Sequence, residues 1–258
     1  MKKIIFFLAF ITVLCSCNEK KKSLAQNSDL LVDNLNGNVQ QTLSKDYQVD
    51  SSGKIGEQDS CCIVVSKYDE KGYISEYDNN DKATPDKSSE KFTHDENGLM
   101  NEIKSFKDGN LNSRISVKTN EGKYLSAEEY DSANQLKNYY TDISQNDYSQ
   151  LTGMKKFNAD STFSGTMASS FNKQIFTGNE MKDSLGKVIY ISTVKLDDKN
   201  NVIESATKNV TKDSTTNTVI KYKYDNYDDN GNWTQRTEMD ENGKPKKITK
   251  REITYYKD

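Results

Sequence analysis

Apolar and polar residues alternate along much of this chain with a period of two. Ile220-Lys221-Tyr222-Lys223-Tyr224 is the clearest example, and residues 188–196 follow the same pattern less regularly. Such alternation predicts strands with one face turned inward. Frequent Tyr and only two Pro residues suit strand ladders. Beyond the first residues, no window has the 3.6-residue period of an amphipathic helix.

A short turn motif separates these stretches. It has Asp at its first position, Gly or Asn three residues later and, in most copies, an apolar residue two further on. The Asp side chain accepts hydrogen bonds from the following backbone, and Gly or Asn tolerates the left-handed conformation of a type I turn with a bulge. The copies are Asp50/Gly53, Asp69/Gly72, Asp95/Gly98, Asp131/Asn134, Asp183/Gly186, Asp197/Asn200, Asp228/Gly231 and Asp240/Gly243. Six of the 13 glycines fall in this frame, against about one expected by chance, which indicates a repeat.

The repeat predicts an all-β fold. We expect an extended antiparallel meander of repeated β-hairpins that forms a curled open sheet or a partly closed barrel. "FKDGNL" at residues 106–111 and "TNEGKY" at residues 119–124 resemble eroded copies, and residues 141–181 hardly show the motif.

Hydrophobic residues make up 33% of the chain and mean hydropathy is −0.91, as in many disordered chains. Periodic Tyr and β-branched residues favour a broad, thin sheet instead.

The N-terminus has the features of a secreted, lipid-modified protein. Met1-Lys2-Lys3 precedes an apolar run, Ile4 to Leu14, that suits a signal peptide and is too short for a permanent membrane span. Leu14-Cys15-Ser16-Cys17 resembles a bacterial lipobox, which predicts cleavage before Cys17 and lipidation of Cys17. An ordinary secretory signal cut nearby is the alternative. The expected parts are a signal peptide (1–16), the lipidated Cys with a polar tether (17–35) and a β-hairpin repeat domain (36–258).

The net charge bears on the kind of partner, and the cysteines bear on thiol chemistry. The sequence has a net charge of −3, and processing would remove Lys2 and Lys3, so a mildly acidic chain remains and no nucleic-acid partner is expected. Adjacent Cys61 and Cys62 precede Ile63-Val64-Val65. Two reduced, buried thiols are the favoured interpretation, with a strained vicinal disulfide or metal binding as the alternatives.

No group of residues stands out as a catalytic, cofactor or metal site. His94 is the only histidine, and it fills a position before a turn Asp where Tyr68, Tyr130 and Tyr227 stand in other copies. We interpret it as a packing position for an aromatic ring. There is no P-loop, Gly-rich dinucleotide turn or helical HExxH, so we expect no cofactor. Acidic stretches such as Asp228-Asp229-Asn230 lack the twelve-residue calcium frame, and Asx turns account for them.

The "YD-x-x-G" frame, as in "YDEKGYI" and "YDDNGNW", resembles the YD repeats of Rhs-type proteins. Together with the lipobox and the closing "GNWTQRTEMDENGKPKKITKREITYY", the chain is similar to envelope lipoproteins of Bacteroidota. The resemblance covers approximately residues 36–258. It implies a β-rich scaffold at the cell surface or in the periplasm, and it carries over no catalytic residues.

We therefore expect a non-catalytic protein, anchored to the membrane by lipid in the cell envelope, whose sheet binds a protein or glycan partner. Asn18, directly after Cys17, favours the outer membrane because it is not the Asp associated with inner-membrane retention. One alternative is an immunity or inhibitor lipoprotein that neutralises a toxin. Another is an enzyme acting on envelope polysaccharide, which would need acids converging in a concave pocket.

Overall fold

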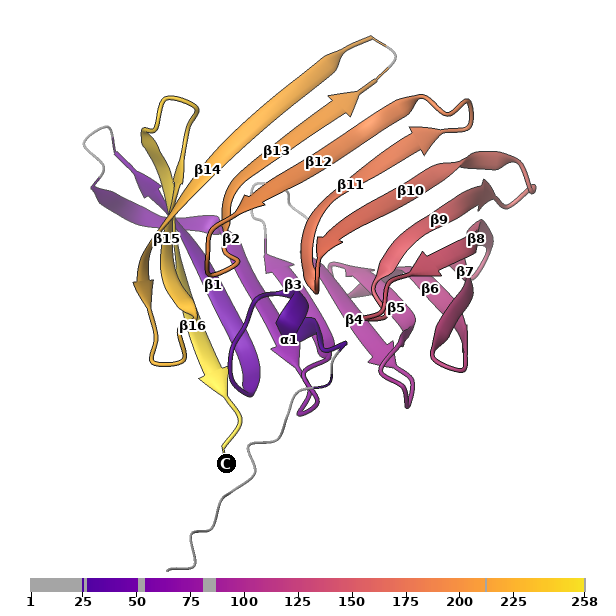
Figure 1. Cartoon of the computed structure of the whole chain (residues 1–258), viewed down its shortest axis with the longest axis horizontal. Coiled ribbons are helices and arrows are strands. Elements are labelled where there is room, and N and C mark those ends of the chain that lie inside the picture. The colour runs from indigo at the N-terminus through magenta and orange to yellow at the C-terminus, as the bar shows by residue number, and fades with distance from the viewer. Residues whose placement is uncertain (1–24, 26, 51–53, 81–86, 212, 258) are drawn as a thin grey trace, which may run out of the picture.

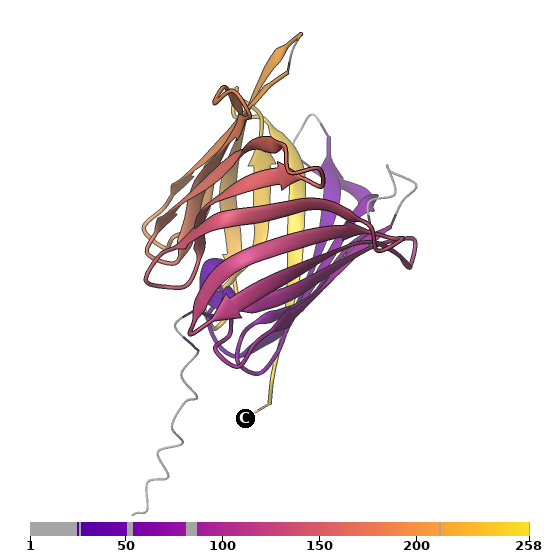
Figure 2. The same ribbon diagram turned by 90° about the vertical axis from the view of Figure 1, so that its right-hand side faces the viewer.

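The molecule is a β-barrel (Figure 1; Figure 2). The computed structural model describes residues 25, 27–50, 54–80, 87–211 and 213–257, except the side chains of residues 59–62. Within these residues, sixteen antiparallel strands follow one another, and β1 (Val39–Val49) pairs with β16 (Pro245–Tyr255) to complete the ring. The other strands are β2 (Ile55–Tyr68), β3 (Ile74–Asn80), β4 (Ser88–His94), β5 (Met100–Lys107), β6 (Asn110–Asn120), β7 (Lys123–Asp131), β8 (Leu136–Gln145), β9 (Leu151–Asn158), β10 (Phe163–Asn172), β11 (Ile175–Asp183), β12 (Val188–Leu196), β13 (Val202–Val210), β14 (Thr215–Tyr227) and β15 (Trp233–Met239).

The all-β antiparallel meander predicted from the sequence is confirmed, and of the two predicted forms the barrel is the one that occurs. Twisted antiparallel strands curl, and closure pairs the backbone groups that an edge strand would leave free. The ladder between β1 and β16 extends from Val39–Tyr255 to Gln48–Lys247. A ring of this many strands is too wide for wall side chains to fill, so most side chains of the wall stay partly accessible.

The repeated Asp turns join strands at both ends of the barrel. In every copy with both positions described, the N–H of the Gly or Asn donates to the Asp carbonyl at 2.9–3.1 Å. The Asp carboxylate accepts two further backbone bonds, as Asp69 does from Lys71 and Tyr73. The turns of Asp69, Asp95, Asp197 and Asp228 lie at one end, and those of Asp50, Asp131, Asp183 and Asp240 lie at the other. Gly53 lies outside the described residues.

The fourth position of each described copy has the left-handed backbone that the turn requires. Asparagine reaches this conformation at a small steric cost, and glycine reaches it at none. The values of φ are 88° at Gly72, 76° at Gly98, 59° at Asn134, 79° at Gly186, 64° at Asn200, 81° at Gly231 and 78° at Gly243.

Residues 141–181 use the same turn with different residues. Asn146 and Asn158 take the place of Asp, and Ser149 and Ser161 take the left-handed position with φ of 61° and 68°. The side chain of Asn146 accepts backbone bonds from Tyr148 and Gln150, as a turn Asp does. At the second turn the side chain of Asn158 instead donates to the hydroxyl of Thr162, and Asp160 accepts the N–H of Thr162. The stretches "FKDGNL" and "TNEGKY" do not adopt the turn of the repeat. They form two-residue turns with positive φ at both central residues, as in a type I′ hairpin.

An N-terminal segment, residues 27–38, crosses one end of the barrel, and we call it the plug. It contains the single-turn helix α1 (Asp29–Val32), whose N-cap is Ser28. The plug is hydrogen-bonded to turns from separate parts of the ring: Asn27 to the carbonyl of Asn97, Ser28 to that of Gly72, Asn34 to that of Lys199, and Asn36 to the side chain of Asn232. Figure 1 shows α1 at this end. Within the described residues, no comparable segment crosses the opposite end.

The most deeply buried side chains lie where the plug meets the wall. Leu30 and Val39 are fully buried, and Leu35 and Tyr68 are almost so. The packed domain therefore includes residues 28–35, which the sequence analysis assigned to the polar tether. Leu30 and Leu35 explain the difference, because they gain more from burial against the barrel than from exposure on a linker. In the part of the chain that is described, no helix is long and apolar enough to cross a membrane.

Gly231 and Gly98 have the same backbone conformation but differ in the space available for a side chain, and mutation can test this difference. At Gly231 (φ 81°) the nearest neighbour of an added Cβ would be the side chain of Asn36 at 3.9 Å, an ordinary contact, whereas at Gly98 (φ 76°) the added Cβ would overlap the phenol of Tyr73. We expect Gly231→Val to lower the free energy of unfolding by more than about 1 kcal/mol, because a β-branched residue strains in this conformation, and Gly231→Asn to be milder. Gly98→Asn should be clearly worse than Gly231→Asn. Thermal unfolding checks this order, and equal melting temperatures for the three variants would contradict it.

Candidate functional site

The register of the strands separates an inward face from an outward one. Ile103 pairs with Ile115, and Val117 pairs with Ala127, and all four line one cavity inside the barrel. Successive strand residues point to opposite faces, so Lys104, directly after Ile103, faces outward. The period-two pattern of the sequence thus places apolar residues on the lumen side of this part of the wall.

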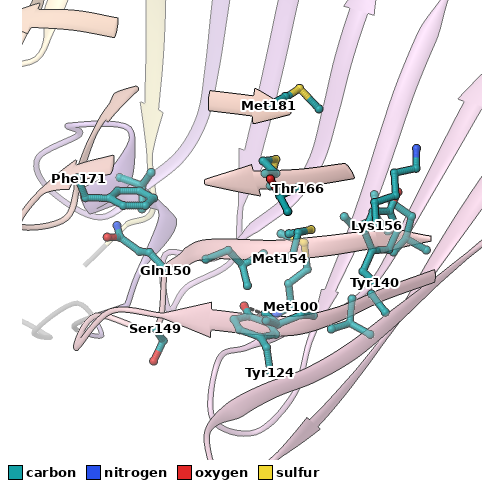
Figure 3. Close-up of a pocket in the computed structure, with 18 of the residues that line it drawn as sticks. Met100, Tyr124, Tyr140, Ser149, Gln150, Met154, Lys156, Thr166, Phe171 and Met181 are labelled. Carbon is teal, nitrogen blue, oxygen red and sulfur yellow. Dashed lines mark hydrogen bonds between the residues drawn. The ribbon is translucent and has the colours of Figure 1, made fainter. Parts of the chain in front are cut away.

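The cavity has a volume of about 600 Å³ and lies against strands β5 to β12 (Figure 3). Four of the six methionines of the chain line it: Met100, Met154, Met167 and Met181. Their neighbours in the wall include Ile103, Ile115, Val117, Ile143, Leu151 and Phe171. Methionine side chains are flexible and polarisable, so they adapt to ligands of different shapes. The wall therefore offers an apolar, adaptable surface.

The two ends of the cavity differ in chemistry. Near the plug, Phe171 and Gln150 lie together, with the side-chain amide of Gln150 donating to the carbonyl of Gln174 at 2.5 Å (Figure 3). Lys156 and Tyr140 lie at the other end. Leu151 begins β9 at the plugged end, so Lys156 is roughly 16 Å further along the strand at about 3.3 Å per residue.

Lys156 is a cation without a carboxylate partner among the described residues. Its Nζ atom lies 5.9 Å from the centroid of the Tyr140 ring. The hydroxyl of Tyr140 donates to Glu129 at 2.7 Å, and Asn138 donates to the same carboxylate oxygen at 2.8 Å. Burial, and then the bond to Glu129, raises the pKa of Tyr140 well above its ordinary value. Glu129 is thus occupied by neutral donors.

The lumen wall formed by β14 to β16 and β1 is polar. The guanidinium carbons of Arg236 and Arg251 lie 5.0 and 3.7 Å from the ring centroid of Trp233. Burial, and then the charge of Arg236, lowers the pKa of Arg251 to about 10. Lys247 pairs with Asp46 at 2.9 Å. The lumen therefore has an apolar side and a charged side.

The outer face of the barrel carries ion pairs around most of the ring. Lys155, which stands between the cavity residues Met154 and Lys156, pairs outward with Asp142 at 2.6 Å. Exposed apolar residues such as Val219 are scattered among the charges. Other pairs are Lys45–Glu252, Lys67–Glu76, Lys104–Glu102, Lys118–Glu128, Lys195–Glu204 and Lys223–Asp225.

The residues singled out from the sequence do not converge on the cavity, apart from His94 and Gly98. The turn aspartates are distributed over both ends, where they accept backbone bonds. Those bonds, with the one from Gln135 contributing most, hold the pKa of Asp131 below its usual range. Cys17 lies outside the described residues, and Cys61 and Cys62 are on β2 with side chains that are not described. No cluster of three or more potential metal-binding His, Cys, Asp or Glu side chains occurs among the described residues.

Three of the turn residues singled out from the sequence lie at the end opposite the plug, away from the cavity lining. Asn134, Gly186 and Gly243 follow β7, β11 and β15, and none of them lines the cavity. A side chain built at Gly186 or Gly243 would meet no described atom within 4 Å. The side chain of Asn134 accepts a hydrogen bond from Arg114 at 3.0 Å on the exposed surface. These three positions therefore shape turns and take no part in the candidate site.

His94 packs as an aromatic ring against the plug. Its imidazole stacks on Tyr73 with centroids 4.9 Å apart, and its Nε2 lies 3.5 Å from Asp29 of α1. The Asp29 carboxylate also accepts the backbone N–H of Ile74 at 2.7 Å. These contacts agree with a packing role for the ring. His94 also lines the cavity.

The lining methionines were missed by the sequence analysis. Met100, Met154, Met167 and Met181 belong to β5, β9, β10 and β11, so nothing local in the sequence brings them together. The one available signal is their position inside predicted strands, where Met is less common than β-branched or aromatic residues.

Comparisons with known proteins show a shared fold. No protein-family model matches the chain, and no curated protein matches it. A porin-like protein from Bacteroides uniformis ATCC 8492 has a similar structure, with a TM-score of 0.50 and 11% sequence identity over 84% of this chain and 96% of that chain. The similarity supports the β-barrel fold alone.

Two further structures align over most of this chain. A porin-like protein from Bacteroides vulgatus ATCC 8482 gives a TM-score of 0.34 at 11% identity, covering 83% of this chain and 98% of that chain. The Photorhabdus luminescens Tc holotoxin pore gives 0.29 at 13% identity, covering 81% and 11%. These two scores are too low to establish a shared fold.

Replacing His94 by Phe tests its packing role. The phenyl ring preserves the stack on Tyr73 and loses only the contact with Asp29, so we expect His94→Phe to fold and to keep the ligand binding proposed below within about threefold. If His94 were a catalytic acid or base, its replacement would instead lower the reaction rate by about 10²–10⁴-fold. If the variant keeps its melting temperature but loses a measured activity by a hundredfold, the packing interpretation fails.

Proposed function

We propose that this is a non-catalytic, lipid-anchored protein of the cell envelope whose barrel binds an apolar molecule in its lumen. The observation that carries the proposal is the apolar, methionine-lined cavity inside a barrel whose outer face is charged. This arrangement is the reverse of a porin, which turns an apolar belt outward and a polar wall inward.

An apolar ligand suits the cavity better than water does. Water in contact with an apolar wall is released when a ligand covers that wall, and the gain is about 25 cal/mol per Å² of apolar surface. The volume of about 600 Å³ falls within the usual range of small-molecule sites, roughly 300–1,000 Å³. Met154 and Met167, paired across β9 and β10, form the middle of this surface.

The outward charges favour a barrel that stands in water and is held to the membrane by its lipid. Lys or Arg on the lipid-facing side of a membrane barrel costs about 2–4 kcal/mol at the bilayer midplane. Lys195 and Lys223 both have side chains 70% exposed, and their partners Glu204 and Asp225 add further charge. A belt of such pairs would oppose insertion.

The envelope location rests on the signal segment and the lipobox-like Leu14–Cys17. The structurally similar protein from Bacteroides uniformis is named porin-like, which agrees with a barrel located in the cell envelope. A protein or glycan partner, a toxin-neutralising role and a polysaccharide-acting enzyme stay predictions from the sequence. The cavity supports an apolar ligand more directly than any of them.

The lipid anchor is tested at Cys17. We expect Cys17→Ser to yield an unlipidated species that leaves the membrane fraction, because acyl chains contribute about 0.8 kcal/mol per buried CH₂ and Lys20–Lys22 contribute much less. Metabolic labelling with a fatty-acid analogue measures this. Equal labelling of the wild type and Cys17→Ser would defeat the lipobox interpretation.

Ligand binding is tested with the neutral fluorophore N-phenyl-1-naphthylamine and the mature chain carrying Cys17→Ser. We expect saturable fluorescence enhancement in this protein. Adding Met167→Glu, which places a charge on the apolar wall, should raise the Kd at least tenfold. Ser170→Glu, on the outward face of the same strand, is the matched control and should leave the Kd unchanged. Absent binding, or equal effects of both substitutions at unchanged melting temperature, would refute the lumen site.

A further inference from the structure

We infer that the ligand is an amphiphile with a single apolar chain and an anionic head, and that Lys156 binds the head. The inference rests on the proposed function and adds the chemistry of the ligand. Lys156 lines the cavity at the end remote from the plug, and it has no carboxylate partner among the described residues. Its neighbour Lys155 differs in both respects, since it faces outward and pairs with Asp142 at 2.6 Å.

The position of Lys156 determines which way round the amphiphile would bind in the lumen. Leu151 and Met154 precede Lys156 along β9, and Met167 lies beside Met154 on β10, so the apolar wall extends from the plugged end up to the amine. A chain that enters from the end opposite the plug would place its tail against the methionines. Its head would then stop beside Lys156 (Figure 3).

The surroundings of the amine suit an anion rather than a cation or a neutral head. Thr166 pairs with both Lys155 and Lys182, so the pair Lys182–Glu180, at 2.8 Å, lies on the outward face and leaves the Lys156 amine without a carboxylate from β11. Glu129, which lies on β7 within reach of Tyr140, accepts from Tyr140 and Asn138 and is held by them. An ammonium beside an apolar wall gains most from a carboxylate or phosphate, because charge-assisted hydrogen bonds are stronger than neutral ones.

The experiment compares three ligands that share a twelve-carbon chain: dodecanoate, dodecyl phosphate and dodecanol. Each displaces N-phenyl-1-naphthylamine from the mature chain with Cys17→Ser at pH 8, below the critical micelle concentrations of the two anions and the solubility limit of dodecanol. We expect each anion to bind about tenfold more tightly than the alcohol. The two anions together show whether the site prefers a carboxylate or a phosphate head.

Two neighbouring lysines provide the decisive variants. Lys156→Met should abolish the preference for the anions and leave the affinity for dodecanol within about twofold, since Met keeps much of the length and the apolar character of the side chain. Lys155→Met, the matched control on the outer face, should behave as the wild type. Lys156→Arg should retain the preference.

The outcomes separate this inference from the function on which it rests. If all three ligands bind the wild type equally, or if the anion preference persists in Lys156→Met, the head-group assignment is overturned while the apolar site stands. If neither the fluorophore nor any of the ligands binds, both are overturned.

Discussion

Pairing of β1 with β16 is the interaction on which the rest of the molecule depends. Until β16 pairs with β1, the sheet has two free edges and no enclosed volume. The ladder joins residues separated by nearly the whole chain, from Val39–Tyr255 to Gln48–Lys247, so it forms at the cost of closing a very long loop. The buried cluster of Leu30, Val39 and Tyr68 lies beside this seam and stabilises it.

Closure gives the two faces of each strand different environments. Most of the wall is only partly buried, so neither face resembles an ordinary core, and the alternation distinguishes a lumen side from an outer side. Met154 and Lys155 show the contrast within two residues: one lines the cavity, and the other forms an ion pair outside. A charged outer face is more stable in contact with water than with lipid.

The sequence predicted the meander well because its turns are local. Asp69 and Gly72 contain within four residues the carboxylate and the left-handed position that the turn needs. The same reasoning failed at Asn146–Ser149, where less typical residues adopt the same geometry. The cavity could not be predicted, because Met100 and Met181 share it only after the ring has curved. The plug was missed because Leu30 and Leu35 are too few to form an apolar period.

In the proposed lipoprotein, the plug would also orient the barrel. Asn27 is ten residue steps from Cys17, which is at most about 36 Å of extended backbone, so a lipid on Cys17 would keep the plugged end nearest the bilayer. The opposite end, toward which Lys156 lies, would then be directed away from that bilayer. A molecule held in the lumen would be loaded and released on the distal side. In the lipid-anchored protein proposed above, the lumen would thus exchange its ligand with the aqueous space and would not conduct through the membrane that holds the anchor.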